Sequence, residues 1–428
     1  MKHNVRLSWV VWFFVIGLTG VVVLLSSCGS PVGSGSTDEG DGGNGGNGGN
    51  DDQDTVQIED GGSLSGTIDS DRTLESNTRY TVNDSLSVEA ELTIDSGAIL
   101  EFAEDTQLLV RDSGVIRAIG TAARPIIFRG ATENAGFWRG VLIYSNNSQN
   151  RLEHVNISHT GSNEIGGQRG ALVLDGFRTG ALAVVNVTIT NGTGHGLVVE
   201  NNATLLEFAT NTFGNLSDTP VRITPNQIAQ LDSLSTFESS NSDNRVEIDE
   251  FGSVDADATW PDPSIAYFVP DLLTVDSALT IEEGARLEFA ASVRMEINRD
   301  GALIADASGG DPIVFTGTVE TPGHWRGIQI ESDDSRNIMD NVVVRYAGEL
   351  GGFAGGENGN VYLYGGLEAA FLTLRNSTIA DGLSHGVVYD SNTTLTDDGT
   401  NQTTPFASVT MSNIGDEVAG GYTDYHQP

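Results

Sequence analysis

The sequence predicts an all-β solenoid in which short strands stack as the rungs of one long coil. Three observations lead to this prediction. The composition is that of a turn-rich protein, the apolar runs are short and separated only by turns, and the whole pattern occurs twice. Glycine accounts for 53 of the 428 residues, whereas aromatic residues make up only 7%. Both values favour a β protein over a helical one.

Short apolar runs recur between turns that are rich in Gly, Asn, Asp and Ser. They occupy residues 92–94, 108–110, 125–128, 141–144, 155–157, 184–189 and 196–199. No window has a sustained helical period, and no gap is long enough for a crossover helix. The runs therefore fit rungs that bury their inward side chains against the next rung. A β-sandwich is the alternative, but it would need turn signals at a regular spacing.

Asparagine marks the bends expected between rungs. Asn186, Asn191 and Asn376 flank apolar runs. Asparagine tolerates a left-handed backbone, and its side chain can form ladders from rung to rung. We therefore expect these residues to stand at corners of the coil.

An internal repeat carries most of the information. Residues 80–161 align with residues 267–348 at a constant offset of 187, with 31 of 82 positions identical. Further matches extend the repeat in both directions, at offsets of 186 and 190. The sequence thus predicts two tandem copies of one unit, a first copy at residues 63–252 and a second copy at residues 253–428.

The motifs within the repeat follow a fixed order. Leu-Thr-Ile-x-x-Gly-Ala-x-Leu-Glu-Phe is followed by Pro-Ile-x-Phe-x-Gly and then by Gly-x-Trp-Arg-Gly, in both copies. This series resembles the right-handed parallel β-helix repeats of bacterial and archaeal surface and secreted proteins. The resemblance covers nearly all of residues 66–428 and implies that fold. It implies no single activity, because the same helix hosts pectate-lyase-like enzymes and adhesins, so function must be argued from a site.

The N-terminus predicts export and lipid attachment. Lys2, His3 and Arg6 precede an apolar run at residues 9–25, as in a secretory signal. The run could also be a short membrane anchor. Cys28 is the only cysteine, and Leu-Ser-Ser-Cys resembles the lipobox of lipoproteins, in which the cysteine is diacylated. We therefore expect a signal peptide at residues 1–27 and a membrane attachment through Cys28.

Residues 28–62 are predicted to form a flexible tether. They consist mostly of Gly, Ser, Asn and Asp and have few apolar side chains to bury. At roughly 5–6 Å times the square root of the residue number, such a tether reaches about 30 Å. The predicted location is therefore the cell envelope, with the β domain facing the periplasm or the extracellular space.

The charge excludes one class of partner. Lys and Arg number 21 against 59 Asp and Glu, which gives a net charge of −38, and Lys2 is the only lysine. A nucleic-acid binder needs clustered cations, so no nucleic-acid partner is expected. Such an acidic surface is typical of halophiles, because molar salt screens its self-repulsion.

The repeated Trp-Arg pair supplies candidate ligand-binding residues. Trp138 and Trp325 could stack on sugar rings, and Arg139 and Arg326 follow them. Residues kept in both copies also fit a purely architectural role, with the indole packed inside and the guanidinium paired near a turn.

No catalytic residues are predicted. A hydrolase of the polygalacturonase type would resemble a series of four motifs, of which only Gly194-His195-Gly196 is present, so His195 is interpreted as a residue of a rung turn. A lyase would use a basic residue beside a calcium ion. Calcium is the one cofactor considered, with Asp69, Asp71, Asp255 and Asp257 as oxygen ligands; the alternative is solvated acidic turns.

The sequence therefore favours a lipid-anchored binding or structural module of the cell envelope, with polysaccharide or other cell-surface components as partners. The alternative is a polysaccharide lyase or glycoside hydrolase acting on acidic glycans.

The lipid attachment is directly testable. Replacing Cys28 by Ser removes the only thiol that can be acylated, so we expect the full chain to move from the membrane pellet to the soluble fraction. Cell fractionation followed by immunoblotting measures this. If the variant stays in the pellet, the apolar run at residues 9–25 holds the protein, and the lipobox interpretation is wrong.

Overall fold

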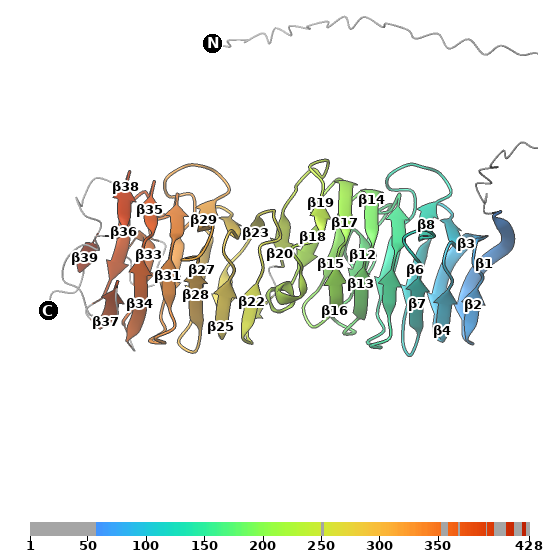
Figure 1. Ribbon diagram of the computed structural model, residues 1–428, viewed down its shortest axis with the longest axis horizontal. Coiled ribbons are helices and arrows are strands. Elements are labelled where there is room, and N and C mark those ends of the chain that lie inside the picture. The colour runs from blue at the N-terminus through green and yellow to red at the C-terminus, as the bar shows by residue number, and fades with distance from the viewer. Residues whose placement is uncertain are drawn as a thin grey trace, which may run out of the picture. The chain divides into compact units, whose positions relative to one another are not determined.

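The computed structural model describes residues 57–249, 252–351, 358–366, 369–390, 392–397 and 408–414, and the backbone of 422–424. The predicted signal peptide, Cys28 and most of the predicted tether lie outside these residues. Val56–Pro428 forms one compact unit. Its strands pair in parallel and stack along one axis, which confirms the predicted parallel β-helix (Figure 1). Within the described ranges, no helix has the length and apolar character of a membrane span.

Three faces make up each coil of the first copy, and the chain visits them in the order A, B, C. Face A contains β5 (Ile99–Phe102), β8 (Ile126–Gly130), β11 (Val155–Ser158), β14 (Thr188–Gly192), β17 (Thr212–Leu216) and β19 (Thr236–Phe237). Face B contains β6 (Gln107–Val110), β9 (Gly140–Ile143), β12 (Gly170–Leu174), β15 (His195–Val199), β18 (Val221–Ile223) and β20 (Val246–Ile248). Face C contains β2 (Arg72–Leu74), β4 (Glu91–Ile94), β7 (Val115–Ile119), β10 (Arg151–Glu153), β13 (Ala181–Val185) and β16 (Thr204–Ala209).

Two long strands begin the coil. They are β1 (Glu59–Ile68) and β3 (Thr78–Val88), and β3 pairs with both β5 and β6, so it spans the corner between faces A and B. β1 begins inside the predicted tether. A 3-10 helix, η1 (Pro225–Gln230), contacts β16 of face C near the end of the first copy.

The strands of the second copy also form three stacks. The strands equivalent to face A are β23 (Tyr267–Val269), β26 (Arg286–Phe289), β29 (Ile313–Gly317), β32 (Val342–Arg345), β35 (Thr378–Ala380) and β38 (Thr410–Ser412). Those equivalent to face B are β21 (Ser253–Val254), β24 (Leu273–Val275), β27 (Arg294–Ile297), β30 (Gly327–Ile330), β33 (Gly359–Leu363), β36 (His385–Tyr389) and β39 (Tyr422–Asp424). Those equivalent to face C are β22 (Ala258–Trp260), β25 (Ala278–Ile281), β28 (Ala302–Asp306), β31 (Ile338–Asp340), β34 (Ala370–Arg375) and β37 (Thr393–Thr396).

The two copies join with an offset of one face. β20 of face B pairs in parallel with β23, which is equivalent in sequence to face A, through Val246↔Tyr267 and Glu247↔Phe268. Face B of the first copy therefore continues into the A-type strands of the second copy. Residues that match in the sequence repeat consequently lie on different sides of the coil.

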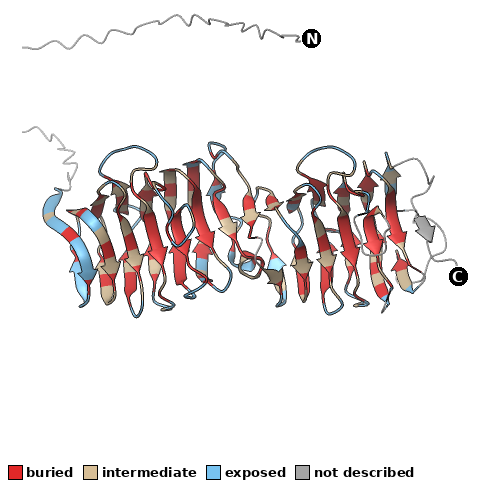
Figure 2. Ribbon diagram, turned by 180° about the vertical axis from the view of Figure 1, so that it is seen from behind, coloured by how far each residue is buried: buried red, intermediate tan, exposed pale blue. Residues whose placement is uncertain are grey.

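The core is a set of inward columns in which each side chain packs on the one below. Along face B one column runs through Leu108, Val141, Leu172, Leu197 and Val221, all fully buried. It continues through Val246 into Tyr267 of the second copy without interruption. Burying each large aliphatic side chain contributes about 1.5–3 kcal/mol. Figure 2 shows this core as the buried stretches of the strands, with exposure concentrated in the loops.

Asparagine stands at corners of the coil, as predicted. Asn186 (φ 51°), Asn191 (φ 56°) and Asn376 (φ 49°) have a left-handed backbone. Asn186 separates β13 from β14, so the apolar run 184–189 is two strands rather than one. The ladders also form: the Asn215 Nδ2 amide donates to Asn191 Oδ1 at 2.5 Å, one coil away.

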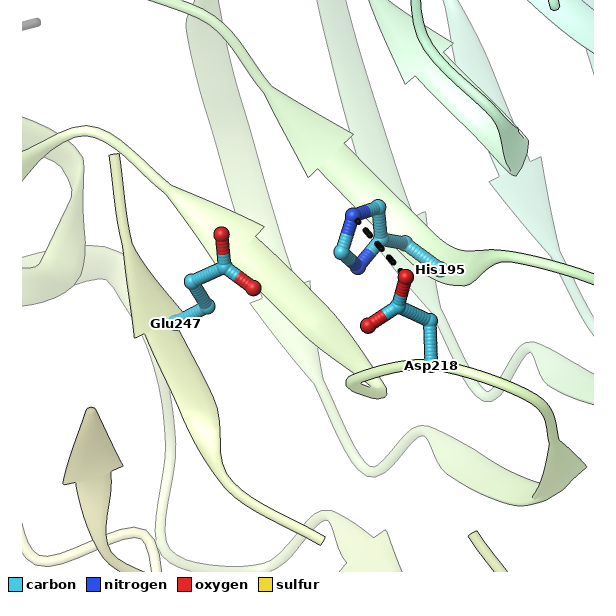
Figure 3. A group of neighbouring side chains, drawn as sticks. All are labelled: His195, Asp218 and Glu247. Carbon is cyan, nitrogen blue, oxygen red and sulfur yellow. Dashed lines mark ion pairs between the residues drawn. The ribbon is translucent and has the colours of Figure 1, made fainter. Parts of the chain in front are cut away.

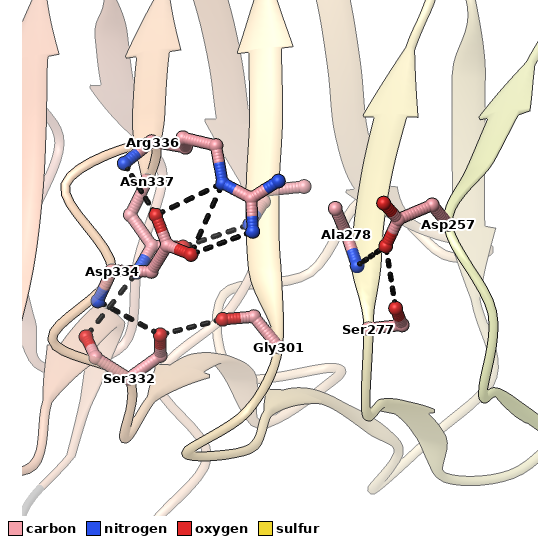
Figure 4. A network of polar contacts seen from close by, with 9 residues as sticks. Asp257, Ser277, Ala278, Gly301, Ser332, Asp334, Arg336 and Asn337 are labelled. Carbon is pink, nitrogen blue, oxygen red and sulfur yellow. Dashed lines mark hydrogen bonds and ion pairs between the residues drawn. The ribbon is translucent and has the colours of Figure 1, made fainter.

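A buried asparagine fixes the same turn in both copies. Asn150 Oδ1 accepts a hydrogen bond from the Ile116 backbone N–H at 3.0 Å, and its amide donates to the carbonyls of Ser145 and Ala181. Asn337, at an offset of 187, accepts from the Leu303 N–H at 2.7 Å. It also donates to the Ser332 carbonyl (Figure 4). The side chain supplies partners that the turn's backbone groups lack.

The hydrogen bonds of Asn150 and Asn337 lead to a prediction about stability. Asn150→Ala leaves the buried Ile116 N–H without an acceptor, which should lower the free energy of unfolding by roughly 1–3 kcal/mol. Asn337→Ala should cost a similar amount, because it removes the equivalent bonds. Urea unfolding followed by circular dichroism measures both. Exposed Asn146→Ala is the control and should lie within about 0.5 kcal/mol of the parent chain. Equal stability of all three variants would contradict this account of the turn.

Candidate functional site

Both repeated tryptophans lie in the core. Trp138 is fully buried and stacks on Phe102, with ring centroids 3.9 Å apart, and its indole N–H donates to the Ser158 carbonyl at 2.7 Å. Trp325 does the same with Phe289 at 4.1 Å and the Arg345 carbonyl at 2.7 Å. Neither indole presents a face to solvent. A sugar ring therefore cannot stack on them, and they are corrected here to core residues.

The repeated arginines pair with acids that have exchanged places between the copies. Arg139 Nε and Nη2 donate to Asp105 Oδ1 and Oδ2 at 3.0 and 2.7 Å, and the Ser162 hydroxyl donates to Asp105 Oδ1. In the second copy Ser292 occupies the position of Asp105, and Glu349 occupies that of Ser162. Arg326 Nε then lies 3.4 Å from Glu349, which accepts from Ser292. An exchange that preserves the pair indicates a structural role.

Asp105 is already engaged by several hydrogen-bond donors. Its pKa is held well below the usual range, first by hydrogen bonds from Arg139 and Asn163 and further by Ser162. Asp105 and Glu104 line a shallow depression with Gly136, Ser162 and Asn163. A calcium ion there would have to displace an arginine that already neutralises Asp105.

Three of the four candidate calcium ligands accept hydrogen bonds within the protein. Asp71 accepts from the Glu91 backbone N–H at 3.1 Å, and Asp257 accepts from the equivalent Ala278 N–H at 3.0 Å. Asp257 also accepts from Ser277, and these two bonds lower its pKa (Figure 4). Asp255 accepts from the Asn226 amide at 2.6 Å. Over the described residues, none of these aspartates, nor Asp69, belongs to a group of three or more metal-ligating side chains.

A group of polar side chains, most of them linked by hydrogen bonds and ion pairs, instead lies along face B. We call it the polar band, and its members are Gln168, Asp175, Glu200, Arg222, Glu247 and Asp249. Gln168 Nε2 donates to Glu200 at 2.9 Å, and Arg222 Nη1 donates to Gln168 Oε1 at 3.1 Å. Arg222 lies 3.5 Å from both Glu247 and Asp249. The Glu200 carboxylate accepts from the Gly176 N–H at 2.9 Å, beside Asp175.

An aromatic group flanks one end of the polar band. The Arg178 guanidinium lies over the Tyr144 ring, 4.0 Å from its centroid, and its backbone N–H donates to Asp175 at 2.7 Å. The neighbouring Phe177 is 89% exposed. Tyr144 and Arg222 are specific to the first copy, because Glu331 and Thr423 stand at the corresponding strand positions of the second copy.

His195, Asp218 and Glu247 converge at the other end of the band (Figure 3). His195 begins β15, Asp218 precedes β18 and Glu247 lies in β20, so three successive coils supply them. One potential ligand atom from each side chain lies within 4.8 Å of the others. His195 Nδ1 is 2.7 Å from Thr219 Oγ1, and His195 Nε2 is 3.7 Å from Asp218 Oδ2.

Burial and charge oppose each other at Glu247. Its pKa is raised, first by burial and further by the nearby Asp218 carboxylate, while His195 and Arg222 act in the opposite direction. Glu247 therefore holds an ionised carboxylate less readily than an exposed glutamate. The arrangement can bind a cation, hydrogen-bond to hydroxyl groups or exchange a proton.

Sequence reasoning identified His195 only as a turn residue and missed its partners. Asp218 and Glu247 lie far along the chain from it, and no motif links them. One signal was available: Arg222 is a charged residue on a short strand of the repeat, and Thr423 stands at its position in the second copy. A charged side chain that occurs in only one copy of a repeated rung is not needed for the fold, so it indicates a surface with another role.

Comparison with known proteins agrees with the fold. Residues 66–175 match the family described as "Pectate-lyase like beta helix domain". No curated protein and no solved structure matches the chain significantly. The matched region covers most of the first copy, including face B up to β12. The match fits a carbohydrate-related surface protein.

The exchanged acid and serine allow a test of the arginine pairs. Asp105→Ser should destabilise the protein by about 1 kcal/mol or less, because the pair is partly exposed, and adding Ser162→Glu should restore the loss. Serine is tolerated there, since Ser292 has the same left-handed backbone, with φ 62° against 59° for Asp105. Thermal unfolding of the single and double variants measures the coupling.

The stabilisation that Asp105 contributes depends on pH. Because the folded pKa of Asp105 is lowered, its contribution is complete above the unfolded value of about 3.9 and is lost as the pH falls. The difference between the parent chain and Asp105→Ser should therefore shrink below about pH 4. Additive effects of the two substitutions at pH 7 would contradict the pairing.

Proposed function

We propose that this parallel β-helix protein is held at the cell surface by the lipid on Cys28 and binds polysaccharide along the outward side of face B. The polar band is the observation that supports this proposal. It links side chains of several successive coils through hydrogen bonds, and its Arg222 is replaced in the second copy by Thr423 at the same strand position. A purely structural rod would show both copies alike, so the band indicates a ligand surface added to the repeat.

The chemistry of the band suits hydroxyl-rich ligands. The partly exposed carboxylate of Glu200 and amide of Gln168 can accept from sugar hydroxyls, and Arg222 and Gln168 can donate to them. Phe177 adds an apolar ring on which the face of a sugar can stack. From the coil of β12 to that of β20 the surface extends about 14 Å, three strand spacings, so it can contact several units of a chain.

The charge of the protein favours a neutral polysaccharide. The net charge is −38, and acids outnumber bases within the polar band itself, with Asp175, Glu200, Glu247 and Asp249 against Arg222. An acidic glycan would meet like charge over this surface. A neutral chain meets no such repulsion.

The predicted signal peptide and tether determine where in the cell this surface lies. A diacylated Cys28 provides the two acyl chains that lasting membrane attachment requires. The Gly-rich segment then gives the β domain about 30 Å of reach, so it can contact glycans beyond the membrane surface.

An enzyme acting on polysaccharide is the second candidate, and the group of His195, Asp218 and Glu247 favours it. An imidazole between two carboxylates can transfer protons. Ligand atoms within 4.8 Å place the two carboxylates closer than the roughly 6.5–9.5 Å of an inverting pair, which argues against hydrolysis with inversion.

A glycan array probed with the detergent-solubilised full chain tests binding. We expect retention on neutral polysaccharides. Phe177→Ala should weaken the binding about tenfold, equivalent to about 1.4 kcal/mol, because it removes the stacking surface. Since Phe177 is 89% exposed, the substitution should leave the unfolding temperature unchanged.

The matched control is Phe371→Ala. Phe371 is an outward, half-buried phenylalanine of β34 in the second copy, away from the polar band. Equal effects of the two substitutions, or no retention on any glycan, would contradict the proposed surface. Release of shorter oligosaccharides from a retained glycan would instead support the enzyme.

A further inference from the structure

We infer that His195, Asp218 and Glu247 form a binding site for one divalent transition-metal ion, such as Zn²⁺ or Co²⁺. This inference does not rest on the proposed glycan binding. It rests on the positions of three side chains from three successive coils and on the orientation of one histidine ring (Figure 3).

The spacing of the three side chains suits a metal centre. Bonds of about 2.0–2.2 Å in a tetrahedral site place the ligand atoms roughly 3.3–3.5 Å apart. His195 Nε2 and Asp218 Oδ2 are 3.7 Å apart, and all three ligand atoms lie within 4.8 Å of one another. Small side-chain rotations of Asp218 and Glu247 close the difference. With three protein ligands, a fourth position stays open to water or substrate.

The hydrogen bonds around His195 orient it as a ligand. The Thr219 hydroxyl donates to Glu247 Oε2 at 3.4 Å. With its single proton used in this way, Thr219 Oγ1 is left as the acceptor for a proton on His195 Nδ1, 2.7 Å away, and we assign that tautomer. The proton on Nδ1 leaves the lone pair on Nε2. A hydrogen bond to the second ring nitrogen is the usual way in which proteins fix a metal-binding histidine.

This orientation would be unfavourable without a cation. The His195 side chain is 10% exposed, and its Nε2 lies 3.7 Å from Asp218 Oδ2. Glu247 adds a second, largely buried carboxylate, which Arg222 contacts at 3.5 Å from its other oxygen. A lone pair and two carboxylates that meet in a partly buried space repel one another, and a divalent ion removes this repulsion.

The ligand set indicates the class of metal. Calcium and magnesium prefer sites made only of oxygen atoms, whereas imidazole suits zinc, copper, iron and nickel. One imidazole with two carboxylates therefore favours a first-row transition metal over calcium. The second copy has a corresponding histidine, His385, and its sequence has Asp416 at the position of Asp218 when Thr410 is aligned with Thr212, as the strand register requires.

Metal binding to the chelator-treated full chain in detergent tests the inference. Equilibrium dialysis against Zn²⁺ or Co²⁺ in high salt, which screens the other acids, should give one tightly bound ion per chain. Asp218→Asn should weaken this binding by at least about tenfold, as should His195→Gln. Asp218 is 49% exposed, so its variant should unfold at the same temperature as the parent chain in the presence of chelator.

His385→Gln is the matched control and should leave the bound ion and its affinity unchanged. The visible absorption of bound Co²⁺ should appear in the parent chain and in this control, and disappear in Asp218→Asn. Equal binding by the parent chain and Asp218→Asn would overturn the inference, as would displacement of Zn²⁺ by an equal concentration of Ca²⁺. Absence of a stoichiometric ion would overturn it as well.

Discussion

The structure depends on one constraint, the packing of each inward side chain on the side chain directly below it. Parallel pairing holds successive coils in register, so an inward position stays inward along the whole column. The column from Leu108 through Tyr267 crosses from one copy to the other without a break. Outward side chains do not enter these columns, so the columns place no constraint on them. The architecture and the candidate site are therefore carried by different side chains of the same strands.

The corners and the pairs near them follow from the same constraint. Asn150 and Asn337 are buried because each coil leaves backbone groups at its turns that only a side chain can reach. The exchange of acid and serine between the copies shows what the repeat preserves. Arg139 and Arg326 each retain an acid partner, although the residue that provides it has changed.

The fold was predictable from the sequence, whereas the candidate site was not. Short apolar runs, asparagine bends and the repeat are local or periodic signals, and each reports directly on a rung. Trp138 and Arg139 drew attention because they recur, and recurrence turned out to mark packing and pairing. His195, Asp218 and Glu247 come together only because coils stack with a particular register, which no spacing in the sequence reveals. The offset at the junction was equally hidden, since it depends on the pairing of β20 with β23.

That offset has a consequence for longer proteins of this design. Joining copies through a one-face step acts as a screw operation on the repeat. A third copy attached in the same way would turn by one more face, and a fourth would return to the orientation of the first. Duplication by this route distributes equivalent surfaces around the axis instead of lining them up, so a growing rod would present the same patch in several directions.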